Sequence, residues 1–157
     1  MAQIITAATT AFPLPYGSPP ATDLAETLET LRSCGLREES RVLLTGTGLA
    51  DAMCTLLRLG FRDAGTVRLG AKLEAGSADA VLAQGIDSVE AGEGVLRLSR
   101  HALVPLGFVA MSFSPAALPA SRAALWREVA RHGLNRLEGY GSNLLVAELP
   151  LFGRLAV

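Results

Sequence analysis

Positive charge, lysine and aromatic side chains are all scarce in this chain of 157 residues. The chain has 14 basic and 15 acidic residues, Lys72 is the only lysine, and aromatic residues make up 5%. A nucleic-acid-binding domain normally carries a basic surplus gathered on one face, so the composition argues against nucleic acid as a partner. Charged residues make up only 18% of the chain and apolar residues 50%, which excludes an intrinsically disordered protein.

The few cysteines and the short apolar runs give no sign of export or of a membrane span. Cys34 and Cys54 form no CxxC or metal-binding pattern, and we expect two buried, reduced thiols. The first residues carry no basic segment of the kind that opens a signal peptide. The longest apolar run, Ala102–Phe113, contains Pro105 and Gly107 and is shorter than the roughly 20 residues of a membrane span. We therefore expect a cytoplasmic protein with no membrane partner.

Proline is concentrated at the N-terminus and divides the chain into two parts. Four prolines lie within residues 1–22, and proline cannot donate to a regular hydrogen-bond ladder. Residues 1–22 are therefore interpreted as an arm and residues 23–157 as one domain, a length that fits a single core. The arm is also apolar, as is the tail 151–157. Either segment could pack on a second copy of the chain, so we expect a homo-oligomer.

Hydrophobic periodicity in the domain predicts helices that alternate with strands. Asp23 with Glu26 marks one helix start, and Gly35 its end. An alternation of this kind indicates an α/β fold with a mostly parallel sheet, and the last two strands indicate an antiparallel hairpin at one edge, turning at 139–143. The predicted helices cover about 23–34, 50–59, 95–103 and 121–132, and the predicted strands about 41–45, 66–69, 78–83, 107–113, 134–138 and 144–149.

The most informative segment is a glycine turn between a predicted strand and a predicted helix. Such a turn lets the backbone approach a ligand and directs free N–H groups toward it, although glycine there can also serve tight turning alone. Polar residues that follow the strand 78–83 lie at the carboxyl edge, where α/β proteins gather their ligands. The candidate cofactor-binding residues are therefore Thr45, Gly46, Thr47, Gly48, Gln84 and Asp87.

Three longer segments share the layout of one enzyme family. They are Arg41-Val-Leu-Leu-Thr-Gly-Thr-Gly-Leu-Ala50, then Ser77–Ala83, then Val95–Ser112 with its Pro-Leu-Gly turn. The three resemble the first motif, the fourth strand, and the following helix and fifth strand of class I S-adenosylmethionine-dependent methyltransferases. The resemblance covers about residues 23–152 and implies a three-layer Rossmann-like methyltransferase fold. Only about eight residues separate the second predicted strand from the third, so we expect one strand–helix unit of the family to be deleted.

Two acids that the resemblance implies for the cofactor site are absent. The family's first motif is acidic-x-Gly-x-Gly-x-Gly, and its acid, which helps to hold the ammonium end of the cofactor, corresponds to Leu44 here. The third glycine corresponds to Ala50. The acid that holds the ribose hydroxyls would end the second strand, where Val67–Ala71 offers none and Glu74 lies further along.

The missing acids set the expected affinity for the cofactor. A hydrogen bond to a charged group contributes roughly 1.5–3 kcal/mol. Two lost contacts then weaken binding by about 3–6 kcal/mol, or two to four orders of magnitude. We further expect Leu44, Leu49 and Leu69 to plug the pocket. The sequence thus predicts a methyltransferase-like domain with a degenerate cofactor site, which binds no cofactor and acts as a non-catalytic binding or assembly module.

Three other functions remain open. A divergent methyltransferase could hold S-adenosylmethionine through backbone contacts around Gly46 and Gly48 and act on a small molecule. A different small ligand, such as an anion, could lie in the turn. A NAD(P)-binding Rossmann protein is the third, but there the last glycine of GxGxxG falls on Asp51, whose carboxylate would repel a pyrophosphate. Tyr140 also lacks a lysine four residues on.

The other polar residues of interest favour structural roles. Asp79 lies at the wrong end of its strand for a ligand, and the Asp-Ser pair 87–88 is expected to cap the next helix. His101 is expected to be a solvated helix residue, His132 to lie at a helix C-terminus, and Trp126 to lie in the core or an interface. The sequence has no Gly-x-Ser-x-Gly elbow and no metal-ligand spacing, so we predict neither a catalytic residue nor a metal.

Overall fold

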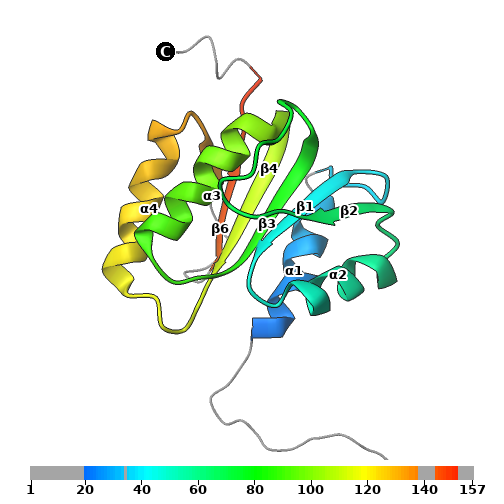
Figure 1. Cartoon of the computed structure of the whole chain (residues 1–157), viewed down its shortest axis with the longest axis horizontal. Coiled ribbons are helices and arrows are strands. Elements are labelled where there is room, and N and C mark those ends of the chain that lie inside the picture. The colour runs from blue at the N-terminus through cyan, green and yellow to red at the C-terminus, as the bar shows by residue number, and fades with distance from the viewer. Residues whose placement is uncertain (1–19, 34, 138–143, 152–157) are drawn as a thin grey trace, which may run out of the picture.

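The computed structural model describes residues 20–33, 35–137 and 144–151. Within these ranges the chain forms four helices and one six-stranded sheet (Figure 1). The helices are α1 (Pro20–Ser33), α2 (Leu49–Arg58), α3 (Val89–Ala102) and α4 (Pro119–Arg131). The strands are β1 (Arg41–Gly46), β2 (Asp63–Thr66), β3 (Ala78–Ile86), β4 (Leu103–Phe113), β5 (Asn135–Leu137) and β6 (Leu144–Glu148).

The sheet has the predicted mixture of parallel and antiparallel pairs. Its strand order is β2-β1-β3-β4-β6-β5. β1 runs parallel to β2 and β3, and β3 parallel to β4. β6 is antiparallel to both β4 and β5. The predicted α/β class, the mostly parallel sheet and the C-terminal antiparallel hairpin are therefore confirmed.

Helices cover both faces of the sheet and make the fold three-layered (Figure 1). Leu28 of α1 and Leu56 of α2 belong to one buried cluster, whereas Leu96 of α3 and Leu125 of α4 belong to the other. Side chains alternate between the two faces along each strand, so β1 directs Leu44 into the α1–α2 cluster. Because of this alternation, the side chain of Leu44 is directed into the core.

Two of the helices end at glycines, and the sequence marked one of them, Gly35, as a stop. Gly35 has φ 116° and Gly133 has φ 74°, a left-handed backbone that favours glycine. After each, the next residue donates back to the helix: Leu36 N to Leu31 O at 3.0 Å, and the equivalent bond after α4 at 3.1 Å. These are the bonds of a Schellman cap, so the stop signals follow from a backbone requirement.

The connection from β2 to β3 is the most unusual part of the fold. Parallel strands are normally joined by a crossover of a dozen or more residues, most often a helix. Here residues 67–77 make the connection with no helix and no strand. The predicted deletion of a strand–helix unit is thereby confirmed, and it leaves β2 at one edge of the sheet.

Several predicted boundaries were wrong. The second strand covers Asp63–Thr66 and not 66–69, because its register with β1 begins at Arg41 opposite Asp63. α3 begins at Val89, six residues before the predicted 95. α1 begins at Pro20 and not at Asp23, since proline is tolerated in a first helical turn.

The outer face of α2 also differs from the prediction. Leu57 is 57% exposed, while Ala52 is buried. Cys54 was expected to be a buried thiol and is exposed. The stripe of this helix that faces the sheet therefore runs through Ala52 and Leu56.

Some predicted features lie outside the described residues. These are residues 1–19 of the arm, Cys34, the hairpin turn 139–143 and the tail beyond Leu151. Among the described residues, no helix is long and apolar enough to cross a membrane.

Candidate functional site

The glycine turn lies at the carboxyl edge of the sheet, between β1 and α2. β1 ends at Gly46, and Gly48 is the N-cap of α2. The Thr47 N–H donates to the Gln84 carbonyl oxygen at 3.0 Å, and the Thr47 hydroxyl donates to the same oxygen at 3.4 Å. Thr45 is 2% exposed beneath them. The structure thus brings the four turn residues and Gln84 together.

The two glycines of the turn have different roles. Gly46 has φ 103°, and a Cβ there would overlap the backbone carbonyl oxygen of Gln84 and lie 2.8 Å from the backbone nitrogen of Gln84. Glycine at this position is therefore required by the packing of β1 against β3. Gly48 has φ 65° and nothing within 4 Å of a built Cβ. The backbone beside Gly48 is the part of the turn that a ligand could approach.

Gln84 contributes an unpaired polar atom to this edge. Its Oε1 atom is buried and has no hydrogen-bond partner among the described residues. A buried acceptor without a partner costs about 1–3 kcal/mol. The Gln84 Oε1 atom can therefore accept a hydrogen bond from water or from a bound group.

The leucines expected to plug the pocket lie elsewhere, so that expectation was wrong. Leu44 is fully buried in the α1–α2 cluster, and Leu49 packs against the same cluster. Leu69 is 39% exposed and lies over Gly94 of α3. Leu44 points into the core because side chains alternate along a strand, and Val42, on the same face of β1, is also a core residue.

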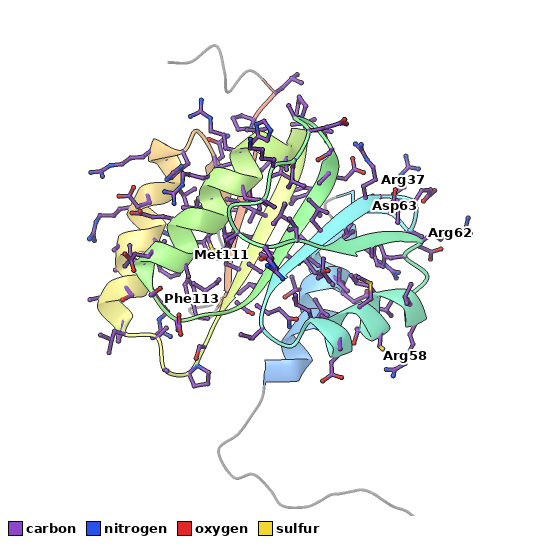
Figure 2. The ribbon with its side chains drawn as sticks, in the orientation of Figure 1. Arg37, Arg58, Arg62, Asp63, Met111 and Phe113 are labelled. Atoms are coloured by element: carbon purple, nitrogen blue, oxygen red, sulfur yellow. The ribbon has the colours of Figure 1, made fainter. Side chains whose placement is uncertain are left out.

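The end of β2 offers no acid, as the sequence predicts. Residues 66–71 contain no aspartate or glutamate. The Val67 N–H donates a hydrogen bond to the Leu44 carbonyl oxygen at 2.8 Å. Asp63 lies at the other end of the strand, paired with Arg41 in the register. Figure 2 shows Asp63 at the upper right and Phe113, the last residue of β4, at the lower left.

Asp87 and Ser88 follow β3 at the same edge as the turn. The Ser88 hydroxyl accepts a hydrogen bond from the Ala91 N–H at 3.1 Å and caps α3, which confirms the predicted cap. Asp87 is exposed beside it. The structure places Asp87 at the predicted edge without a hydrogen bond to the turn.

Asp79 and Asp51 have the positions that the sequence assigned to them. Asp79 accepts from the Arg41 backbone N–H at 2.7 Å and forms an ion pair with its Nε at 3.4 Å. This pair joins the starts of β1 and β3, far from the turn. Asp51 lies exposed in the first turn of α2, where its charge opposes the binding of a pyrophosphate.

The histidines and the tryptophan have structural contacts. The His101 Nε2 atom lies 2.6 Å from the Leu73 carbonyl oxygen, so this exposed histidine fastens the connection 67–77 to α3. Sequence reasoning missed that contact, which joins residues 28 positions apart. His132 is the C-cap of α4. Trp126 packs on the α3–α4 cluster, with the Arg136 guanidinium 3.9 Å from its ring.

The described residues hold no candidate metal centre. No group of three or more histidine, cysteine, aspartate or glutamate side chains within them could hold a metal ion. The edge instead presents backbone N–H groups, hydroxyls, one amide and the exposed carboxylate of Asp87. Such a set can hold a ligand by hydrogen bonds, although Asp87 has no hydrogen bond to the turn.

Comparison with known proteins places the fold but not the activity. No family model matches the chain, and no curated protein matches it. Among solved structures, a S-adenosylmethionine-dependent methyltransferase from Aquifex aeolicus is similar with TM-score 0.59 and 14% identity, covering 81% of this chain and 89% of that one. The amino pentose methyltransferase CalS10 of Micromonospora echinaspora, solved with S-adenosylmethionine bound, is similar with TM-score 0.54 and 14% identity, covering 85% and 93%.

A proposed sarcosine dimethylglycine methyltransferase from Galdieria sulphuraria is similar over 75% of this chain but only 63% of its own, with TM-score 0.57 and 16% identity. This chain therefore spans less than two thirds of that protein. Identities this low establish architecture and nothing about substrate. The strand order, the three layers and these likenesses agree: the chain has the fold of the class I S-adenosylmethionine-dependent methyltransferases.

Proposed function

We propose that this domain keeps the methyltransferase fold without its cofactor and serves as a binding or assembly module. The observation that carries the proposal is Leu44. This residue stands where the resemblance implies an acid, and it is fully buried among the side chains of α1 and α2. An aspartate or glutamate there would bring an unpaired charge into the core, which is strongly unfavourable.

The geometry of the second missing contact supports the same conclusion. Residues 66–71 follow the carboxyl end of β2 without an acid, and the connection then turns toward α3, where Leu69 contacts Gly94. The residues at the turn therefore fit S-adenosylmethionine poorly. They offer neutral donors and acceptors where the resemblance implies carboxylates for the ammonium and the ribose hydroxyls, and hydrogen bonds to a charged group are the stronger ones.

A thermal-shift titration with S-adenosylmethionine and S-adenosylhomocysteine tests the proposal. A ligand at 100 times its dissociation constant stabilises a protein by about 2.7 kcal/mol, which raises the melting temperature of a chain this size by about 5–10 °C. We expect no shift at millimolar ligand. CalS10, solved with S-adenosylmethionine bound, is the positive control in the same plate. A shift of that size in this protein would overturn the proposal.

A divergent small-molecule methyltransferase is the second candidate, and two observations favour it. The Gln84 Oε1 atom is buried and unpaired among the described residues, and the space above Gly48 is open. A cofactor held by these groups and by the N–H groups at the start of α2 would need no carboxylate. If this candidate is correct, the same titration gives a shift, and Gln84→Ala reduces it while Gln84→Glu, which keeps an acceptor there, does not.

The assembly part of the proposal concerns the edge strand β2. Among the described residues its outer edge has no partner strand, and exposed edges tend to be covered. We propose that the arm 1–22 or the tail 151–157 of a second copy takes part in a homodimer. Light scattering of the full chain and of a chain that begins at residue 20 tests this. A dimer that dissociates on truncation supports the arm, and monomers for both would refute the homodimer.

A further inference from the structure

The connection 67–77 forms one wall of a cavity along α3. It contacts that helix at two points, near the middle and near the C-terminal end: Leu69 packs over Gly94, and the Gly76 N–H donates to the His101 carbonyl oxygen at 3.2 Å. A segment without a helix is thinner than the helix that usually makes such a crossover. The space beside it is a cavity of about 440 Å³, which is the size of a small-molecule site.

One part of the cavity lining is apolar. Leu69, Leu73 and Leu98 line it together with Gly94. A Cβ at Gly94 would lie 3.3 Å from the Leu69 Cδ1 atom. Glycine at this position therefore leaves space between α3 and the connection 67–77. An apolar stretch of a ligand would fit against these leucines.

The rim of the cavity carries opposite charges at separate points of one helix. Glu90, Arg97 and His101 all line it, and together with Gly94 they follow the spacing of one helix face. Glu90 has no ion-pair partner among the described residues, and the Arg97 pair with Glu93 is long, at 3.9 Å. Seven residues of helix separate the two charges, about 10 Å along the axis.

We propose that this cavity binds a linear zwitterion whose cation and carboxylate are separated by an apolar spacer. Glu90 receives the cation, Arg97 receives the carboxylate, and the leucines contact the spacer. A simple anion or a simple cation would leave one rim charge without a partner. His101 is a positioning residue, because its Nε2 atom holds the Leu73 carbonyl and thereby the wall.

This site is separate from the glycine turn. None of Thr45–Gly48, Gln84 or Asp87 lines the cavity. The proposal therefore does not depend on whether the turn binds S-adenosylmethionine, and each can fail without the other.

Titration of the full ¹⁵N-labelled chain with 6-aminohexanoate, followed by NMR, tests the proposal. We expect amide shifts confined to residues 69–73 and 90–101 and saturation at low millimolar ligand or below. Hexanoate and hexylamine each lack one charge and should bind about tenfold more weakly or worse, because a charge-assisted contact contributes at least that factor. No shifts at 10 mM, on the order of the weakest useful affinity, or shifts centred on the turn, would overturn the proposal.

Charge-neutral variants sharpen the test through ligand preference. Glu90→Gln should abolish the preference for the zwitterion over hexanoate, and Arg97→Gln the preference over hexylamine. Glu39→Gln and Arg127→Gln change the same charges at exposed positions outside the cavity, and they should leave both preferences intact. A merely structural effect would weaken all three ligands equally, and that result, or unchanged preferences in both rim variants, would refute the assignment.

Discussion

Two glycines on α3, only two positions apart, should respond in opposite ways to the same substitution. Gly92 lies under α4, and a Cβ there would overlap the Leu125 Cδ1 atom and lie 2.9 Å from its Cγ. Leu125 is fully buried, so it has no solvent to move into. Gly92→Ala gains about 1 kcal/mol of helix propensity but overpacks the core at a cost of about 1–3 kcal/mol. We expect a net loss of up to about 2 kcal/mol.

Gly94→Ala should stabilise the protein. The nearest atom to its built Cβ is the Leu69 Cδ1 at 3.3 Å, and Leu69 is 39% exposed. A side chain at that exposure can shift by a few tenths of an ångström without strain. The gain in helix propensity is then largely kept, and we expect a net stabilisation of about 0.5–1 kcal/mol.

Urea denaturation and thermal unfolding of the two variants measure the difference. A gap of about 2 kcal/mol corresponds to about 4–8 °C in melting temperature at this chain length. A double-mutant cycle then assigns the cause. In a Leu125→Ala background the obstructing methyl groups are gone, so Gly92→Ala should become stabilising. Equal stability of the two alanine variants, or no coupling between positions 92 and 125, would refute the packing of α3 against α4 described above.

Two further predictions concern the edge that carries the turn. Ser88→Ala removes the hydroxyl that accepts from the Ala91 N–H and should cost about 1 kcal/mol, whereas Ser88→Asp keeps a cap and should cost little; urea midpoints with an unchanged slope would show it. Gly46→Ala should cost at least about 3 kcal/mol, because it combines an unfavourable φ with overlap on Gln84. Gly48→Asn should cost less than about 1 kcal/mol, since asparagine tolerates that backbone and the space is open. Similar losses of unfolding free energy for the variants at Gly46 and Gly48, measured by the same urea denaturation, would contradict their separate roles.

Local signals allowed the fold to be predicted wherever one residue decides an element. Gly35 and Gly133 stop helices through backbone geometry that few other residues adopt, and Ser88 starts one through a single hydrogen bond. The second strand was misplaced because its sequence, Asp-Ala-Gly-Thr, has little strand character. Pairing with β1 determines its position, and pairing is a tertiary effect that no local pattern contains.

The candidate site was predictable in position but not in detail. The turn and Gln84 meet because both follow parallel neighbouring strands. The role of Leu44 depended on strand parity across the whole sheet, and its direction into the core was not expected. The contact between His101 and Leu73 joins residues far apart in the chain, so spacing alone could not reveal the wall of the cavity. Glu90 and Arg97 share one face of α3, but Glu90 lies before the predicted helix start at residue 95, so the sequence did not place the two charges on one helix.

The two proposed properties trace to one structural change. A crossover between parallel strands usually contains a helix that covers part of the sheet, and here residues 67–77 replace it. No acid follows the last residue of β2 in this connection, and we proposed a weakened nucleoside site at the turn on that ground. The same path runs along α3 and leaves a cavity with Glu90 and Arg97 on its rim. The proposed loss of binding at one edge and the proposed site on one face therefore require no separate explanations, and lengthening this connection should affect the cavity before the turn.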